Sequence, residues 1–307
     1  MDQSVPLLSP QQLRQYEEQG YLIVPDVVSP EIISIMKKRT SELIEASREV
    51  GSSNDTYDLE DGHSSSNPRL TRVKEPHRVD PAVFYNPVLG ADCMLPRILR
   101  DLLGDAVAIQ TSKLNIKSCG GGQAVEWHQD WAFYPATNAS LLAVGLMVDD
   151  VSEDNAPLHV IPGSHKGPLL SHHNQAGTHF CGAVSPSDPD FHKDRAVCLT
   201  GKAGSVTIHH VRLLHGSAPN RSDRNRIMCF YEVAAADAWP LAGGASYIHS
   251  LSQAALWADM VDRMIFGQPC MTPRLENNPV RLCLPPAPRG GSIFKTQKSG
   301  GAVSAFQ

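Results

Sequence analysis

The first third of the chain alternates between helical and extended patterns of apolar side chains. Ser9 and Pro10 begin one helix and Gly20 ends it, because serine caps a first turn, proline fits the first helical position and glycine adopts the left-handed conformation. Ser29 and Pro30 repeat the start signal before a longer helix. The pattern predicts helices at 10–19, 31–50 and 95–104, with a short strand at 21–28.

From Ala106 the pattern changes to short β-branched or alternating runs. Gly, Pro, Asn and Asp separate these runs, and no helical period lies between them. Such strands favour an antiparallel sandwich or barrel, for example a jelly roll, so the predicted fold class is mainly β with flanking α-helices. The predicted strands lie at 106–118, 140–151, 157–165, 204–215 and 225–236.

Length and pattern together predict a single domain over residues 1–285. Its jelly-roll core spans about 105–235 and its helical N-terminal part spans 9–104, with one more helix around 252–267. A chain of 307 residues is long enough to bury a sizeable core. Residues 286–307 are expected to form a flexible tail.

Residues 51–68 are rich in Ser, Asn, Asp and Gly and show no periodicity. This composition is typical of a long mobile loop. Two interpretations stay open, because long loops in compact domains are often either disordered insertions or lids over an active site.

Composition excludes several classes of protein. The net charge is −5 and no basic stripe is present, so nucleic acid is not expected as a partner. The seven cysteines are scattered and form no CxxC pair, which argues against a disulfide framework and favours a reducing, cytoplasmic location. No signal peptide and no apolar run of about twenty residues is visible, so no membrane span is expected.

The segment EWHQDWAFYP places His128 and Asp130 two residues apart. On a strand both side chains point to one face, where they form either a structural ion pair or part of a metal site. Several later histidines could supply a third ligand, and His215 stands out because it ends a predicted strand before the turn GSAPN. Two histidines and one carboxylate are the ligands of non-haem Fe(II) oxygenases. Zinc accepts them too, so a zinc hydrolase or isomerase, or a ligand-binding pseudo-enzyme, remains an alternative.

Arg226 has a chemical role in the iron interpretation. A 2-oxo acid that chelates iron has a second carboxylate, and arginine is a bidentate, permanently charged partner for it. Ser217 could add a hydrogen bond. The competing interpretation pairs Arg226 with Asp223 or Glu232 on the surface.

The motifs HQDWAFYP, VIPGSHKGPL and HGSAPNRSDRNR, with the opening YEEQGYLIVPDVVSPE, resemble the phytanoyl-CoA dioxygenase family of Fe(II)/2-oxoglutarate-dependent oxygenases over residues 10–235. The resemblance implies a double-stranded β-helix, which is a cupin-like jelly roll. It also implies an enzyme that uses Fe(II), 2-oxoglutarate and O2 and releases succinate and CO2. The implied site residues are the metal ligands His128, Asp130 and His215, the 2-oxoglutarate ligands Arg226 and Ser217, and Gln129 and Lys113 near the co-substrate.

Side chains near these motifs are candidates for the substrate cavity. Trp131, Phe133 and Tyr134 follow the metal motif and could wall the cavity, although core packing explains them equally well. Arg72 opens the basic cluster RVKEPHR, which could meet an anion or form a solvated face. The three histidines of LLSHHNQAGTHF could hold a second metal or simply lie in a loop.

The function predicted from the sequence is oxidation of a C–H bond in a hydrophobic small molecule, in secondary metabolism or in lipid or acyl metabolism. The resemblance favours hydroxylation, because Asp130 keeps the carboxylate that related halogenases lack. Desaturation, epoxidation and rearrangement stay open. The expected partner is a small-molecule substrate, and the sequence leaves monomer and homodimer equally open.

Overall fold

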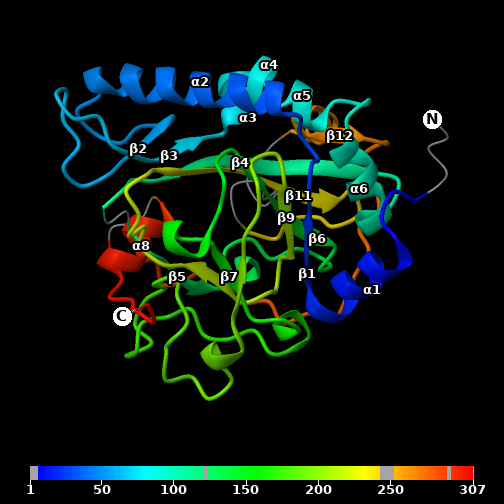
Figure 1. Cartoon of the computed structure of the whole chain (residues 1–307). Coiled ribbons are helices and arrows are strands. Elements are labelled where there is room, and N and C mark those ends of the chain that lie inside the picture. The colour runs from blue at the N-terminus through cyan, green and yellow to red at the C-terminus, as the bar shows by residue number, and fades with distance from the viewer. Residues whose placement is uncertain (1–5, 121–122, 243–251, 289–291, 307) are drawn as a thin grey trace.

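The computed structural model describes residues 6–120, 123–242, 252–288 and 292–306. Its framework is two antiparallel sheets, which lie one above the other in Figure 1. The larger sheet has the order β1-β9-β6-β11-β4-β3-β2, with β12 paired to β4, and the smaller has the order β5-β10-β7-β8. The strands are β1 (Tyr21–Val24), β2 (Tyr57–Leu59), β3 (Leu70–Lys74), β4 (Val107–Lys117), β5 (Val125–His128), β6 (Leu141–Met147), β7 (Leu158–Val160), β8 (Val197–Leu199), β9 (Val206–His210), β10 (His215–Ser217), β11 (Arg226–Ala235) and β12 (Met264–Phe266).

Helices α2 to α5 cover the outer face of the larger sheet, where they run across β4 and β3 (Figure 1). Met36 and Phe84 from these helices share one buried cluster with Val144 and Tyr231 from the strands. This apolar layer fixes the sheet that carries half of the site. The helices are α1 (Pro10–Gln19), α2 (Pro30–Ala46), α3 (Pro76–Val79), α4 (Pro81–Phe84), α5 (Asn86–Leu89), α6 (Met94–Leu103), α7 (Gln253–Asp262) and α8 (Ile293–Ser299).

The predicted start and end of the first helix are confirmed. Ser9 Oγ accepts a hydrogen bond from Gln12 N, and the Gln12 side chain accepts one from Ser9 N, which makes a capping box. Gly20 ends α1 with φ of +79°, the left-handed conformation. Ser29 caps α2 through one hydrogen bond, which its Oγ accepts from Ile32 N.

Strand β4 shows how the fold separates core from site. Leu114 and Ile116 pack into the apolar cluster under the helices. Lys113, Asn115 and Lys117 lie between them in sequence and line a cavity on the other face. Because side chains alternate along a strand, one run of residues builds both surfaces.

One predicted strand is divided between the two sheets. Residues 204–215 were expected to form a single strand, but β9 pairs with β6 in the larger sheet and β10 pairs with β5 in the smaller. A turn separates them, in which Leu213 N donates to His210 O. The crossing carries His215 into the smaller sheet, and an alternating apolar pattern cannot reveal such a change of sheet.

Two segments expected to lack structure pack against the domain instead. Within 51–68, β2 pairs with β3 and buries Asp58, although whether this segment is a lid remains a prediction. The expectation of a flexible tail was wrong for residues 292–306, where α8 forms and Phe294, Gln297 and Ala305 are buried. Their packing partners lie far away in the sequence, so no local pattern announces them.

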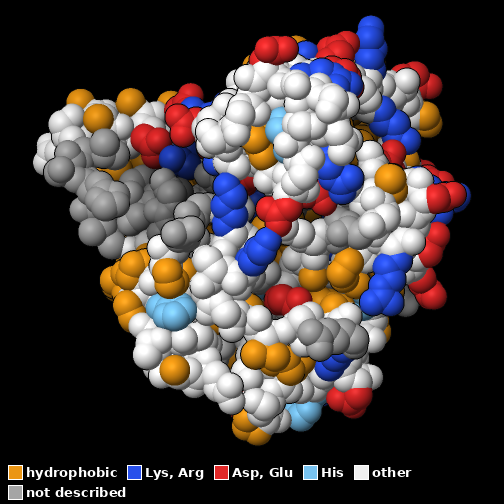
Figure 2. Space-filling model, turned by 90° about the vertical axis from the view of Figure 1, so that its left-hand side faces the viewer, with side chains coloured by type: hydrophobic (Ala, Val, Ile, Leu, Met, Phe, Trp, Pro, Cys, Tyr) orange, Lys and Arg blue, Asp and Glu red, His pale blue; other side chains and the backbone are white. Residues whose placement is uncertain are grey.

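The surface charges and the cysteines are arranged as the composition of the chain led us to expect. On the face shown in Figure 2, Lys and Arg side chains are mixed with Asp and Glu rather than gathered in a stripe. All seven cysteines are free thiols. Among the described residues, no helix has the length and apolar character needed to span a membrane.

Candidate metal and co-substrate site

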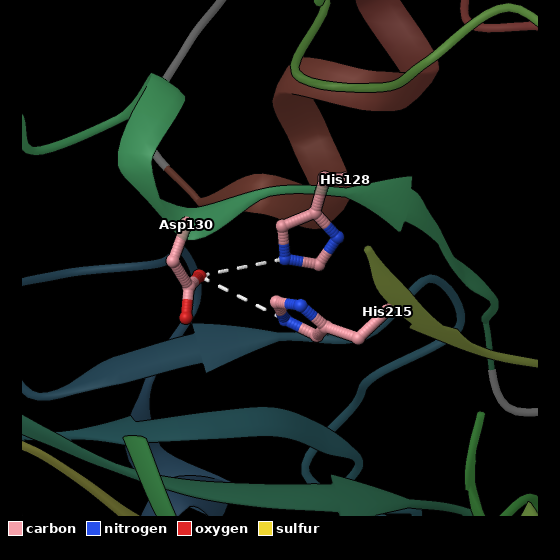
Figure 3. A group of neighbouring side chains, drawn as sticks. All are labelled: His128, Asp130 and His215. Carbon is pink, nitrogen blue, oxygen red and sulfur yellow. Dashed lines mark ion pairs between the residues drawn. The ribbon is translucent and has the colours of Figure 1, made fainter. Parts of the chain in front are cut away.

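Three side chains that could bind a metal converge at the ends of neighbouring strands (Figure 3). His128 ends β5, Asp130 begins the 3-10 turn that follows, and His215 begins β10 directly opposite His128. Asp130 Oδ1 lies 3.6 Å from His128 Nε2 and 3.8 Å from His215 Nε2. One candidate ligand atom from each residue lies within 4.8 Å of the other two, and no second such group occurs among the described residues.

Backbone carbonyls orient both imidazoles. His128 Nδ1 lies 2.7 Å from Glu126 O, and His215 Nδ1 lies 2.9 Å from Leu213 O, so each Nδ1–H donates to a carbonyl. This arrangement leaves both Nε2 lone pairs for a metal, as is usual for histidine ligands. Burial, together with the neighbouring imidazoles, lowers the pKa of His215 well below its usual value, so the ring is neutral at pH 7.

The donor set fits divalent iron. Two neutral imidazole nitrogens and one carboxylate oxygen would occupy one face of an octahedral ion and leave the remaining positions for other ligands. Burial raises the pKa of Asp130, but its interactions with His215, His128 and His209 outweigh burial and hold this pKa well below its usual range. The carboxyl group is therefore ionised and able to bind a cation.

His209 is a neighbour of this site that the sequence analysis did not single out. Its Nε2 lies 3.5 Å from Asp130 Oδ2, and its ring centroid lies 4.3 Å from that of His215. The residue is buried in β9, in the larger sheet, so the two sheets meet at Asp130. The signal in the sequence was the dipeptide His209–His210 in a strand, which by alternation must send one imidazole inward.

A cavity of about 420 Å³ opens beside the three candidate ligands and is lined at one end by Ser217 and Arg226. Arg226 is buried, its Nη2 donates to Ala156 O over 2.9 Å, and its Nε has no hydrogen-bond partner among the described residues. Burial lowers the pKa of Arg226 to about 10, which leaves it charged at pH 7. A buried charged group with an unused donor fits a carboxylate ligand, and neither Asp223 nor Glu232 takes that place.

Lys117 lies beside Arg226, and the sequence analysis did not identify it as a residue of the site. Its Nζ donates to the backbone oxygen of Ser217 over 3.0 Å, which ties β4 to the end of β10. Burial, and then the charge of Arg226, lowers the pKa of Lys117 well below its usual value. Lys113, Asn115 and Lys117 are spaced two residues apart on one strand, so the sequence could have shown that all three point to the same face.

Lys113 and Arg72 also line the cavity. The Lys113 ammonium forms an ion pair with Glu232. Arg72 donates through Nε to Asn115 Oδ1 over 3.0 Å, and Asp58 lies 4.0 Å from its Nη1. Arg72 is thus a buried cation facing the cavity rather than part of a solvated basic face.

The aromatic residues after the metal motif divide between cavity and core. Phe133 and Tyr134 line the cavity. Trp131 does not, because it is fully buried in a separate apolar cluster and its Nε1 donates to Pro279 O. The prediction of a cavity wall is wrong for Trp131.

Gln129 also points away from the cavity, so the expectation that it lies beside the co-substrate is wrong. Its Nε2 donates to Pro168 O and Arg212 O, and its Oε1 accepts from Leu170 N. Strand alternation places it opposite His128 and Asp130. The Gln129 amide therefore links the loop that contains Pro168 and Leu170 to the loop that contains Arg212.

Both ring nitrogens of His172 bond to backbone groups, so this histidine supports the fold and is not placed to bind a metal. Its Nε2 accepts a hydrogen bond from Gln129 N over 2.8 Å, and its Nδ1 donates to Leu170 O. His173 and His179 contact other carbonyl groups, at Leu284 and Gly300. No second metal site forms from these three histidines.

Stability of the apoprotein is expected to fall as the pH drops from 7 to 5. Burial lowers the pKa of both His172 and His210 to about 3, whereas a histidine in the unfolded chain titrates near about 6.5. Below about pH 6.5 the unfolded chain therefore binds protons that the folded chain does not. Each group lowers the free energy of unfolding by up to about 1.4 kcal/mol per pH unit. Urea denaturation at several pH values measures this, and a flat profile would contradict it.

The two sheets and the site between them define a 2-oxoglutarate-dependent non-haem iron dioxygenase with a double-stranded β-helix fold, as the comparisons with known proteins confirm. The phytanoyl-CoA dioxygenase (PhyH) family matches residues 16–228, and the chain belongs to this family.

Several known proteins are similar to this chain over most of its length. A probable alpha-ketoglutarate-dependent hypophosphite dioxygenase of Stutzerimonas stutzeri is 34% identical over 293 residues, which cover 94% of this chain and 97% of the relative. An ectoine dioxygenase of Sphingopyxis alaskensis is 27% identical and is matched over 69% of this chain and 71% of its own. The crystal structure of EctD from S. alaskensis with 2-oxoglutarate and 5-hydroxyectoine shares the fold, with a TM-score of 0.65, 24% identity and coverage of 82% and 88%.

Proposed function

We propose that His128, Asp130 and His215 hold the iron of this dioxygenase and that Arg226 and Ser217 hold the distal carboxylate of 2-oxoglutarate. The observation that carries the proposal is a juxtaposition within one cavity. Two imidazoles whose Nδ1 atoms are already hydrogen-bonded stand beside an ionised carboxylate, and a buried guanidinium with an unused Nε lines the same space.

The protein contributes orientation and exclusion of water to the reaction. When bound, Fe(II) and 2-oxoglutarate supply the oxidising chemistry, in which one oxygen atom of O2 enters the substrate and the other enters succinate. Arg226 orients the co-substrate, and Lys117 fixes the strand end that carries Ser217. Phe133 and Leu141 line the cavity with apolar surface. Burial, together with the charge of Asp130, raises the pKa of Tyr134 well above its usual value, so its hydroxyl stays protonated and can only orient neighbouring groups.

For the substrate we propose a compact anion. Three cationic side chains, Arg72, Lys113 and Arg226, line the cavity against two carboxylates, Asp130 and Glu232, and Lys117 adds a further buried basic group. The charges of Fe(II) and 2-oxoglutarate cancel, so the excess of positive charge remains and favours an anion. The Arg72 guanidinium donates a hydrogen bond through Nε and its Nη1 lies 4.0 Å from Asp58, which leaves Nη2 for an oxyanion. The 34%-identical relative is named for hypophosphite, which has this chemistry.

A second candidate is the hydrophobic small molecule predicted from the sequence. Phe133, Leu141, Met228, Phe230 and Phe294 also line the cavity, and they would suit an apolar substrate. The two candidates differ in their need for Arg72. An apolar substrate would make no use of a buried guanidinium.

One experiment tests the site and the substrate separately. Anaerobic addition of Fe(II) and 2-oxoglutarate to the apoprotein is expected to produce a weak visible charge-transfer band. After oxygen is admitted, hypophosphite should stimulate succinate formation, and phosphorus NMR should show its P–H bond converted to P–OH. Arg72→Met should keep the band but raise the KM for hypophosphite about 10- to 100-fold, since a hydrogen bond to a charged group contributes about 1.5–3 kcal/mol.

The outcomes separate the alternatives. A band without any response to hypophosphite would reject this anion and direct the search to apolar compounds. Bound iron without a band would reject the co-substrate roles of Arg226 and Ser217 and favour a metal protein that does no oxidation.

A further inference from the structure

The C-terminal segment, residues 292–306, lies against β5, the strand that carries the candidate metal ligand His128. Helix α8 contacts β5, and Figure 1 shows it in red beside that strand. This segment lies outside residues 16–228, which match the family. Its contacts with the site therefore lie outside the part of the chain that the family model matches.

Gln297 of α8 binds the backbone of Glu126 from both sides. Its Oε1 accepts from Glu126 N over 2.9 Å, and its Nε2 donates to Glu126 O over 3.3 Å and to Gly182 O over 2.9 Å. The Gln297 side chain is buried, with 4% of the residue exposed, so no solvent competes for these bonds. Glu126 O is the same atom that accepts the hydrogen bond from His128 Nδ1.

The end of the segment makes a second contact with Glu126 and also contacts its neighbour Trp127. Ala305 N donates to the Glu126 carboxylate over 3.0 Å. The Phe306 ring stacks on Trp127, with ring centroids 5.6 Å apart and planes 11° from parallel. Both residues that precede His128 are thus held by the last fifteen residues of the described chain.

The same helix closes one side of the cavity. Ile293 and Phe294 line it, and the Arg72 guanidinium lies 5.6 Å from the centre of the Phe294 ring. Phe294 makes none of the hydrogen bonds to Glu126. A change at Phe294 therefore alters the cavity wall and leaves the support of His128 in place.

We propose that Gln297 is a positioning residue of the metal site and that it acts through Glu126 on His128. The inference rests on the proposed role of His128 as a metal ligand. Gln297 bonds both the N–H and the carbonyl of Glu126, so the backbone on either side of this residue resists rotation and the His128 ring keeps its Nε2 directed toward Asp130 and His215. Partners of this kind, one step removed from the metal, typically contribute about 10- to 100-fold to metal affinity.

Gln297→Met tests the proposal in the full-length protein. Methionine has nearly the same length and fills the buried space but makes no hydrogen bonds. Fe(II) and Co(II) affinities are measured by anaerobic titration, and the charge-transfer band is recorded with 2-oxoglutarate. We expect both affinities to fall about 10- to 100-fold and the band to shift. Hydrogen exchange of the α8 amides reports whether the segment stays in place.

Three matched variants define what the result means. Leu275→Ala removes an apolar side chain that is 77% exposed, and Phe294→Leu changes only the cavity wall, so both should keep wild-type metal affinity. Phe306→Ala loosens the same segment without deleting a hydrogen bond to Glu126. It should weaken metal binding less than Gln297→Met does.

Wild-type metal affinity in Gln297→Met would overturn the proposal. Equal losses in Gln297→Met and Phe306→Ala would also overturn it, because attachment of the segment alone would then explain both. If the wild-type protein binds metal but shows no band with 2-oxoglutarate, the proposed function has failed, and the titrations still decide the role of Gln297. A wild-type protein that binds neither metal would overturn both proposals.

Discussion

The His128→Ala variant is expected to bind Fe(II) too weakly to support turnover while keeping its fold. The change removes one of three ligand atoms that lie within 4.8 Å of one another. The loss should exceed the about 10- to 100-fold effect that is typical of a residue supporting a ligand. Titration of the apoprotein with Fe(II), together with succinate formation from 2-oxoglutarate, measures the effect. Circular dichroism verifies that the two sheets still form.

His192→Ala is the matched control, since His192 is exposed and contributes to none of the contacts at the site. It should keep wild-type metal affinity and turnover. Substantial turnover in His128→Ala would reject the assignment of the metal ligands. Recovery of activity by added imidazole would instead support it, because the free ring can occupy the vacated space.

The Arg226→Met variant is expected to raise the KM for 2-oxoglutarate about 100- to 1000-fold and to leave Fe(II) affinity nearly unchanged. Two charge-assisted hydrogen bonds of about 1.5–2 kcal/mol each, the lower part of the usual range for bonds to charged groups, account for that fold-change. Burial strengthens the effect, because a carboxylate left without its partner in this cavity has little water to replace it. Succinate formation at increasing 2-oxoglutarate concentration gives the KM, and a direct Fe(II) titration gives the metal affinity.

Two further variants sharpen this result. Arg226→Lys keeps the charge but loses the planar pair of donors, so its KM should lie between those of wild type and Arg226→Met. Arg221→Met removes an exposed arginine of the preceding loop and should change nothing. An unchanged KM in Arg226→Met would remove this residue from the co-substrate site.

Local physical chemistry explains why much of the fold was predictable. Ser9 and Ser29 cap helices through hydrogen bonds within a single turn, so the helix starts can be found from a few adjacent residues. Alternation along β4 and β11 likewise depends only on neighbours in the chain, and the strand pattern indicated a jelly roll. The candidate ligands were predictable for the same reason. His128 and Asp130 are two residues apart, and His215 and Arg226 begin strands that follow turns.

Other features depend on which surfaces meet in space. Only the pairing of β9 with β6 in the larger sheet brings His209 to Asp130, and only the packing of α8 brings Gln297 to Glu126. These contacts join residues about 80 and 171 positions apart, and the pattern around either partner contains no information about the other. The same holds for Trp131, which is core rather than cavity wall because Pro279 lies where its Nε1 can donate.

The sequence by itself thus determined the type of elements, the side chains available as metal ligands and the positive charge that Arg226 carries. The tertiary structure decided which face each side chain shows, how the crossing strand divides between the sheets, and that the C-terminal segment belongs to the site. The physical reason is the separation along the chain over which each kind of interaction acts. Capping, alternation and turn formation act over a few residues, whereas burial of Phe294, Gln297 and Ala305 depends on surfaces that exist only after the sheets have formed.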